Sequence, residues 1–589
     1  MFYDLIAMKA DEMLLDLTQE TLINDDQFIA AIEEQLKIAP ENPQLLPKYD
    51  FIIIGAGTSG CVVANRLSEN PNWSILLIEA GNDENPLFDI PFPANLLQYT
   101  SANWNYRNLL NENRCSNSDG RECQTISGKV MGGSSTINYM IYTRGNHKDY
   151  DRWEDCGNVG WSYEHVLPYF KKIENFTINT LKESKYHGFN GFMHVGYPDF
   201  ATKFVNVTIK AYKEFGLNYV DYNGKYQIGI SRIQSNLKNG FRHSSNTAYI
   251  NSFRRSNLHI IKLSIVKRIL INPKTKRAYG VEFVSKGKSR SVLAEKEVIL
   301  SAGAIRSPQM LMLSGIGPKK QLKNLKIPLI KNLPVGENLM DHIGINLLYT
   351  IEKPYTIPSN LKIDLTYTKQ PEKNFQSIPG GVELISFHDL KDPFNPRGIP
   401  DVELLYFTNS AMSKSLLNIT NDIYGFSILV LLLSPKSRGV IKLASNDEPL
   451  VYPNYLSDPE DVNILKEGVK LAYDISQQKA FKAIGAKLHD VSLGKCHFDI
   501  MSDAYVECIV RSLSISINHF CGTCKMGPID DESSVVDDRL MVHGVNNLRV
   551  IDASIIPEII KGHPHSVALM IGEKGSDMIK QDWNYTNSN

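Results

Sequence analysis

The stretch that most constrains the fold is a glycine-rich turn between two apolar runs, YDFIIIGAGTSGCVVANRLSENPNWSILLIEAG, from Tyr49 to Gly81. Phe51–Ile54 is a short β-branched run typical of a buried strand, and apolar residues after the turn recur at helical spacing. Ser74–Glu79 predicts a second buried strand. The order strand, turn, helix, strand predicts an α/β protein with a Rossmann-like nucleotide-binding domain.

Within this turn, Gly55, Gly57 and Gly60 give the spacing G-x-G-x-x-G. Gly55 permits the tight turn, and Gly57 lets the backbone approach a pyrophosphate at the N-terminus of the helix. Glu79 ends the second strand, where its carboxylate can accept hydrogen bonds from ribose hydroxyls. A glycine-rich turn in an unrelated α/β protein would not need a strand before it, a helix after it and an acidic residue at the end of the next strand. The spacing alone does not distinguish NAD from FAD.

The length and the net charge of the chain indicate how many domains to expect and which partners are not expected. The chain has 589 residues, beyond the roughly 250–300 that one hydrophobic core supports, so more than one domain is expected. Its net charge of −1 gives no reason to expect nucleic acid or an anionic membrane as a partner. The longest apolar run, Phe426–Leu433, is far shorter than the roughly 20 residues of a membrane span and predicts a buried strand.

Cysteines and sequons bear on export without deciding it. Cys115 and Cys123 bracket a polar loop and could form a disulfide or remain free thiols. The N-terminal run MFYDLIAMKADEMLLDL lacks the basic start of a signal peptide and predicts a short amphipathic helix. Sequons that would make a secreted chain a glycoprotein occur at Asn175, Asn206, Asn418 and Asn584. We favour a secreted protein slightly over a cytoplasmic one.

Further along the chain, β-branched runs predict strands, and the run Ser307–Gly317 predicts a helix ended by glycine. From about Pro328 to Ser514 the pattern is irregular, and Ser566–Lys580 predicts a final helix. The predicted strands of this part are Leu258–Asn272, Tyr279–Ser285, Lys296–Gly303 and Leu548–Ser554.

Four further blocks follow the fingerprint in order: Gly128–Gly145, Gly303–Gly317, Leu333–His342 and a C-terminal block that begins NHFCGTCKMGP. Together the five resemble the glucose–methanol–choline (GMC) oxidoreductases, flavoproteins that bind FAD. The resemblance spans Tyr49 to Asp582. Within this family, the sequence is most similar to the insect glucose-dehydrogenase-like branch, as in NYMIYTRGNHKDYDRW from Asn138 to Trp153.

The resemblance implies a Rossmann-like FAD-binding domain with a discontinuous, sheet-based substrate-binding cap. Residues 1–47 would then be a leader, and 48–345 would hold most of the FAD domain with part of the cap. Residues 346–514 would form mainly the cap, and 515–582 would be a C-terminal segment that supplies catalytic and FAD-binding residues.

The same resemblance implies a set of residues that bind FAD. Gly55, Gly57, Thr58, Ser59 and Gly60 would hold the pyrophosphate, and Glu79 the adenosine ribose. Val266 would meet the adenine through its backbone. The flavin and ribityl side would be lined by Met131, Gly133, Ser134, Asn138, Asp552 and Ala553.

For catalysis, the resemblance places His519 beside flavin N5 and assigns His563, six residues after Pro557, as its partner. His565 is an addition to that pattern. Oxidising an alcohol removes a hydroxyl proton and a hydride from one carbon, and an imidazole has the pKa that the proton acceptor needs. The expected activity is FAD-dependent oxidation of a CH–OH group to the carbonyl, with oxygen or another electron acceptor.

Other interpretations stay open at this point. Cys521 and Cys524, or His563 and His565, each offer two metal ligands where a zinc site needs at least three, so we expect no metal. A hydroxynitrile lyase on the same fold would also use a histidine base, and a flavin-binding protein without catalysis would need neither histidine. The substrate alcohol, the mode of FAD attachment and the oligomeric state are left open.

Overall fold

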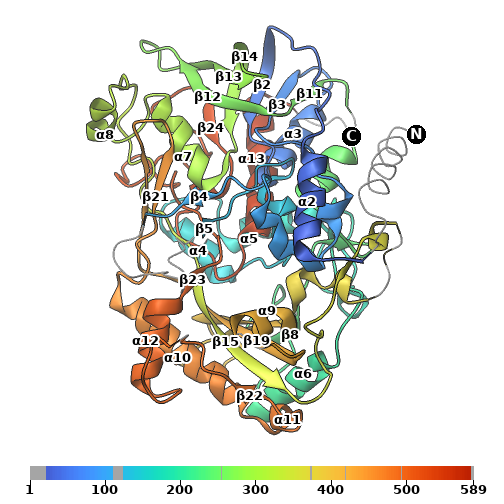
Figure 1. The fold of residues 1–589 in the computed structure, drawn as a ribbon. Coiled ribbons are helices and arrows are strands. Elements are labelled where there is room, and N and C mark those ends of the chain that lie inside the picture. The colour runs from blue at the N-terminus through green and yellow to red at the C-terminus, as the bar shows by residue number, and fades with distance from the viewer. Residues whose placement is uncertain are drawn as a thin grey trace.

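The computed structural model describes residues 22–109, 124–253, 255–369, 371, 374–417, 420–492 and 494–585. Two large sheets organise it, one at the top and one at the bottom of Figure 1. The amphipathic helix predicted for the first residues and the predicted pair Cys115–Cys123 lie outside the described residues. The leader is partly helical as predicted, because α2 (Asp25–Leu36) starts at a capping box between Asn24 and Gln27.

The first sheet has the order β11-β3-β2-β14-β13-β12, with β24 also paired to β14. Strands β11, β3, β2, β14 and β24 run parallel, while β12 and β13 extend the sheet through antiparallel pairs. The predicted strands are confirmed, although the stretch Leu258–Asn272 divides in two. The bounds are β2 Lys48–Ile54, β3 Ile75–Ile78, β11 Leu258–Ile261, β12 Ser264–Ile271, β13 Ala278–Ser285, β14 Lys288–Leu300 and β24 Leu548–Val550.

The turn between β2 and helix α3 (Thr58–Ser68) depends on two glycines. Gly55 adopts φ +97°, a left-handed conformation that disfavours any other residue. A Cβ on Gly60 would lie 2.0 Å from the Gly55 carbonyl oxygen, so the first turn of α3 can pack against β2 only without a side chain there. The fingerprint therefore sets both the direction of α3 and its distance from the sheet.

The first domain is completed by residues far along the chain. Helix α13 (His565–Asp582) packs against α3, near the centre of Figure 1. The buried Arg66 of α3 donates from Nη2 to Glu573 Oε1 of α13 at 2.8 Å. The predicted discontinuous domain is thus observed, with β24 and α13 joining strands and helices of the N-terminal half.

Helix α7 (Gly303–Leu313) begins four residues earlier than the predicted start at Ser307 and ends before Gly317. Pro308 inside it has no N–H to donate to the carbonyl of Ala304. The Thr523 hydroxyl donates to that carbonyl instead, at 2.5 Å. A side chain from the C-terminal part of the chain therefore supplies the hydrogen bond that the proline lacks.

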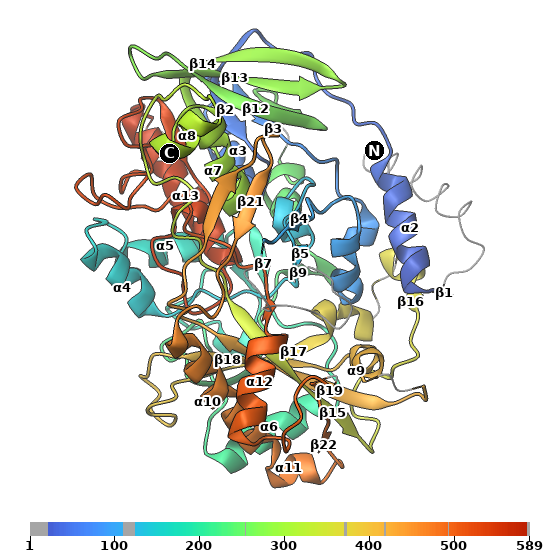
Figure 2. The ribbon, with the colours of Figure 1, turned by 60° about the vertical axis from the view of Figure 1, so that its left-hand side comes forward.

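The second sheet, with the order β22-β15-β19-β18-β17-β8 and β23 paired to β15, is antiparallel. Helices α6, α10, α11 and α12 cover one face (Figure 2), and we call this sheet with these helices the cap. Phe426–Leu433 is buried, as predicted, and all of it except Leu433 lies in β19. The strands are β8 Gly229–Arg232, β15 Ile343–Ile351, β17 Val382–His388, β18 Val402–Phe407, β19 Tyr424–Leu432, β22 Lys487–Leu488 and β23 Ile515–Ser516.

Alternation along β18 separates the two faces of the cap sheet. Leu404 and Tyr406 pack in the apolar cluster under the helices, while Leu405 belongs to a second cluster on the opposite face. That opposite face is turned toward the first domain. The cap helices are α6 Phe204–Phe215, α10 Pro459–Ser476, α11 Lys479–Lys482 and α12 Asp503–Leu513.

The remaining α-helices and short strands are not part of the two large sheets. The helices are α4 His147–Asp155, α5 Tyr163–Ile173, α8 Lys319–Asn324 and α9 Ser410–Leu416. The short strands are β1 Leu22–Ile23, β4 Tyr106–Arg107, β5 Gln124–Thr125, β6 Glu174–Phe176, β7 Met193–Val195, β9 Leu237–Lys238, β10 Phe241–Arg242, β16 Ile363–Asp364, β20 Val440–Leu443 and β21 Pro449–Tyr452. A disulfide that the sequence did not predict joins Cys496 to Cys508 in the cap.

Candidate active site

A cavity of about 500 Å³ is lined by residues of both the first sheet and the cap. It gathers thirteen of the fifteen predicted site residues, from segments that are far apart in the sequence. Gly60 and Met131 do not line it: Gly60 packs against the turn, and the Met131 side chain is buried in the core. The lining residues are Gly55, Gly57, Thr58, Ser59, Glu79, Gly133, Ser134, Asn138, Val266, His519, Asp552, Ala553 and His563.

The nucleotide side of this cavity fits a dinucleotide. Helices α3 and α7 both begin on the cavity, so their free N–H groups can meet a pyrophosphate. A Cβ on Gly57 would lie 3.9 Å from the Ser301 carbonyl oxygen, and one on Gly303 would have open space for 4 Å around it. Protein packing thus leaves the space at both helix starts free. The buried Ser301 hydroxyl between them has no hydrogen-bond partner among the described residues, as expected of a group that a ligand would satisfy.

The Glu79 side chain already accepts hydrogen bonds from the protein backbone. Its Oε2 accepts from the Ala56 N–H and its Oε1 from the Gly81 N–H, both at 2.8 Å. Burial raises the pKa of this carboxyl, and the backbone donors oppose that rise. The carboxylate therefore holds the glycine turn in place, and its remaining lone pairs can accept hydrogen bonds from a ribose.

We expect Glu79→Ala to weaken retention of FAD, because charge-assisted hydrogen bonds of this kind contribute about 1.5–3 kcal/mol each. The turn also loses both backbone contacts, so the melting temperature should fall even without the cofactor. FAD released on gel filtration and a thermal melt of the cofactor-free protein measure the two effects separately. Unchanged FAD retention would show that Glu79 only supports the turn.

Asp552 connects the C-terminal part of the chain to α7. Its Oδ2 accepts from the Gly303 N–H at 2.9 Å and from the Ser307 hydroxyl at 2.5 Å, and its Oδ1 accepts from the Ser554 N–H. Burial raises the pKa of this carboxyl. On the flavin side, Asn138 Oδ1 accepts from the Met140 N–H and from Arg242. These contacts fix the positions of two predicted FAD residues.

The two predicted catalytic histidines meet at the cap end of the cavity. The rings of His519 and His563 lie edge to face, 4.6 Å between centroids. His563 Nε2 lies 2.7 Å from Oε1 of Glu403, a fully buried residue of β18. Since Glu403 is a carboxylate acceptor, His563 donates from Nε2. The motif positioned His563, but nothing in the sequence pattern indicated Glu403.

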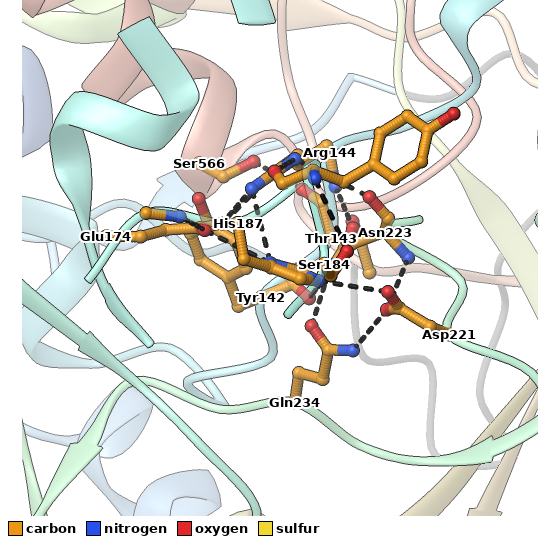
Figure 3. A network of polar contacts seen from close by, with 12 residues as sticks. Tyr142, Thr143, Arg144, Glu174, Ser184, His187, Asp221, Asn223, Gln234 and Ser566 are labelled. Carbon is orange, nitrogen blue, oxygen red and sulfur yellow. Dashed lines mark hydrogen bonds and ion pairs between the residues drawn. The ribbon is translucent and has the colours of Figure 1, made fainter. Parts of the chain in front are cut away.

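A buried polar network anchors the loop that carries His563 (Figure 3). The His563 N–H donates to the Thr143 hydroxyl at 2.5 Å, and Ser566 donates to the Thr143 carbonyl. The neighbouring Arg144 pairs with Glu174. The loop is therefore attached to a rigid, fully enclosed segment.

The same network continues through His187, which lies between Glu174 and Asp221 at 3.1 and 2.9 Å. Burial alone would lower the pKa of His187, but the two carboxylates outweigh it and raise that pKa. The residues of the network thus carry alternating charges, which is how buried charges are made tolerable.

A third histidine, His342, determines the tautomer of His519. His342 Nε2 lies 3.1 Å from the Leu433 carbonyl, which can only accept, so Nε2 carries the proton. Burial lowers the pKa of His342 to about 3, so the ring is neutral and its Nδ1 is an acceptor. His342 Nδ1 lies 2.9 Å from His519 Nδ1. His519 therefore donates from Nδ1, and its Nε2 keeps a free lone pair.

The backbone of His519 is fixed as well. Its N–H donates to Asp341 Oδ1 at 2.7 Å, while Tyr455 and Ser516 donate to Oδ2. Burial raises the pKa of Asp341 to about 6, against the pull of these donors. Asp341 and His342 are the last two residues of the block Leu333–His342. The sequence motif therefore included them but did not indicate what they do.

His565 also lines the cavity, at the start of α13. Burial lowers its pKa to about 4. Cys521 and Cys524 are both buried free thiols beside this region. Across the described part of the chain, no three or more His, Cys, Asp or Glu residues are grouped so as to hold a metal ion.

A Rossmann-type sheet whose glycine turn opens on a cavity, with histidines on the opposite side under an antiparallel cap, is the arrangement of an oxidoreductase that binds a dinucleotide cofactor. Comparison with known proteins gives the family. Sequence models of the GMC oxidoreductases match residues 49–344 and 435–572, and the chain belongs to that family. It binds FAD and is an oxidoreductase that acts on the CH–OH group of its donor.

Several relatives cover almost the whole chain. Glucose dehydrogenase [FAD, quinone] of Drosophila pseudoobscura pseudoobscura is 38% identical over 91% of this chain and 87% of its own. Oxygen-dependent choline dehydrogenase of Vibrio vulnificus is 34% identical over 90% of this chain and 94% of its own. The solved structure of an Aspergillus oryzae formate oxidase variant superposes with a TM-score of 0.80 at 26% identity, covering 92% of this chain and 100% of that one.

Proposed function

We propose that His519 takes the hydroxyl proton of the substrate alcohol through Nε2, while His563 donates a hydrogen bond to the same oxygen. Bound FAD supplies the hydride acceptor. The observation that carries this proposal is the chain from the Leu433 carbonyl through His342 to His519, because it leaves Nε2 of His519 as the acceptor. Burial also lowers the pKa of His519 well below its usual value, which keeps the ring neutral and able to accept a proton.

Glu403 gives His563 a different role from His519. Its carboxylate accepts from Nε2 of His563, so Nδ1 is the nitrogen that remains for the substrate oxygen. With a proton on each of its ring nitrogens, His563 donates from Nε2 to Glu403 and from Nδ1 to the alcohol oxygen. His563 thus stabilises developing negative charge on the alcohol oxygen, while His519 accepts the proton.

The division of roles predicts an order among variants. His563→Asn should slow reduction of bound FAD by a smaller factor than loss of His519, because an amide can still donate a hydrogen bond to the oxygen. His565→Asn should be close to neutral. Anaerobic stopped-flow reduction with an active alcohol measures all three rates. If His565→Asn abolishes reduction and His563→Asn does not, the roles of these two histidines are exchanged.

We also propose that the protein is secreted. The Cys496–Cys508 disulfide supports this, since disulfides persist in oxidising compartments. Asn206 and Asn584, two of the sequon residues, are exposed. Among the described residues, no helix has both the length and the apolar character that crossing a membrane requires.

Export predicts a glycoprotein. Glycosidase treatment of protein taken from its native source should lower its apparent mass, because exposed sequons are accessible to the glycosylation machinery. Thiol labelling without reductant should leave Cys496 and Cys508 unlabelled. An unchanged mass together with labelled Cys496 and Cys508 would place the enzyme in a reducing compartment.

A further inference from the structure

The wall of the cap that faces the catalytic histidines is apolar. Every second residue of β18 faces this side of the cap sheet, namely Glu403, Leu405 and Phe407. Leu405 and Phe407 also line the cavity. The strand register places Leu429 of β19 beside Leu405, and Val382 of β17 beside Phe407. Both neighbours also line the cavity. The surface next to the Glu403–His563 pair is therefore hydrocarbon.

Loops around the histidines extend this apolar surface. Ile515 and Ile517 line the cavity just before His519, and Tyr139 lines it from the segment after the glycine block. Tyr139 and Phe407 lie edge to face at 6.3 Å between ring centroids. Ser516 and Asn518 also line the cavity here, but the Ser516 hydroxyl donates to Asp341 and the Asn518 amide oxygen accepts from the Ile126 N–H. Few side chains near the reacting carbon are thus left to hydrogen-bond a polyhydroxylated ring.

The charged side chains at the cavity already interact with other groups of the protein. Its carboxylates are Glu79 and Asp552, and both accept hydrogen bonds from backbone N–H groups at the nucleotide side. Glu403 is paired with His563. Arg306, a cation, lies over the Trp104 ring at 4.1 Å. Within the described lining, no carboxylate remains to pair with a positively charged substrate.

A hydrogen-bonding group without a protein partner lies farther along the cap wall. Asn346 of β15 lines the cavity, and its Oδ1 has no partner among the described residues. The register pairs it with Leu429, so it lies two strands from Leu405, roughly 9–10 Å across the sheet. Asn95 and Gln98 add two more neutral amides to the lining.

We propose that this enzyme oxidises uncharged alcohols whose carbinol carbon is flanked by an apolar skeleton, with any further polar group at the end that reaches Asn346. Sugars and quaternary ammonium alcohols are then poor substrates. The inference rests on the proposed function, because it takes the two histidines as the place where the hydroxyl is held. A sugar hydroxyl against the leucine wall would lose its hydrogen bonds to water without replacement.

Matched pairs of alcohols test the proposal with the purified FAD-loaded enzyme. Cyclohexanol and cyclohexylmethanol present ring and exocyclic carbinols of the size of D-glucose without its other hydroxyls. 3,3-Dimethyl-1-butanol has the shape of choline without its charge. Anaerobic reduction of the flavin should give kcat/KM for each apolar member at least about 100-fold above that of its polar or charged counterpart.

The Asn346 amide is tested with 1-hexanol and 1,6-hexanediol, which differ only in the far hydroxyl. Asn346→Leu should lower the diol-to-hexanol ratio of kcat/KM by about 3–10-fold, the worth of one hydrogen bond. The ratio is the readout, because it cancels any change that affects both alcohols alike. Leu429→Met, on the neighbouring strand, is the matched control and should leave the ratio unchanged.

The outcomes separate this proposal from the one on which it rests. If none of these alcohols reduces the bound FAD, the proposed function fails with it. If D-glucose or choline reduces the flavin as fast as its apolar counterpart, the histidine chemistry stands and the apolar substrate class is overturned. An unchanged diol ratio in Asn346→Leu would overturn the placement of the polar end.

Discussion

We expect His519→Ala to slow reduction of the bound FAD by about 10²–10⁴-fold, the usual cost of losing a general base. The reason is positional, since the free Nε2 lone pair on the cavity belongs to a ring fixed at Nδ1 by His342. The absorption spectrum of oxidised FAD should stay nearly unchanged, because we expect the glycine turn and the starts of α3 and α7 to hold the nucleotide. Anaerobic stopped-flow spectrophotometry with saturating alcohol gives the rate.

A matched control separates chemistry from damage to the site. His565→Ala removes an imidazole of the same size from the same cavity and should keep most of the rate. Should His519→Ala reduce FAD at the wild-type rate, the base must be another group, and the hydrogen-bonded chain through His342 would have no catalytic meaning.

His342→Leu is expected to lower the same rate by about 10²-fold or more, although His342 does not line the cavity. Without an acceptor at Nδ1, His519 can adopt the other tautomer, with its proton on Nε2, where it cannot accept the proton of the alcohol. In serine proteases, holding the catalytic histidine in the wrong tautomer costs about 10⁴ in rate. The KM should change much less than kcat, because the substrate surface is intact.

His342→Gln provides the test that a purely structural role would not pass. Its amide oxygen can still accept from His519 Nδ1 and its amide N–H₂ can still donate to the Leu433 carbonyl, so it should recover part of the rate lost in His342→Leu. Equal loss in both variants, with equal loss of thermal stability, would mean that His342 only fills space.

The local parts of this site could be predicted because short-range geometry determines them. A chain that follows a buried strand with Gly55 and Gly60 has few ways to turn into a helix, so the strand–turn–helix–strand unit follows from about thirty residues. The start of α7 was missed for a related reason. The hydrogen bond that makes Pro308 acceptable inside the helix comes from Thr523, which the local pattern does not contain.

The partners of the histidines could not be predicted because they depend on how two sheets meet. His519 and His342 are 177 residues apart in the chain, and His563 and Glu403 are 160 apart. Glu403 looks like any other acidic residue in an irregular stretch of sequence. Only the register of β17, β18 and β19 turns it to the cavity side while its neighbours Val402 and Leu404 pack in the core.

The discontinuous first domain also sets an order of events at the ribosome. Strand β24 and helix α13 are translated after the whole cap, yet α13 packs on α3 and β24 pairs with β14. At about 5–20 residues per second, the early half of the nucleotide fold waits tens of seconds for these partners, with the α3 surface that they cover exposed. The cap, most of which is contiguous, can fold during that wait. Nascent chains should therefore depend on chaperones at this stage, and the cavity is complete only once Asp552 and the start of α13 have been synthesised.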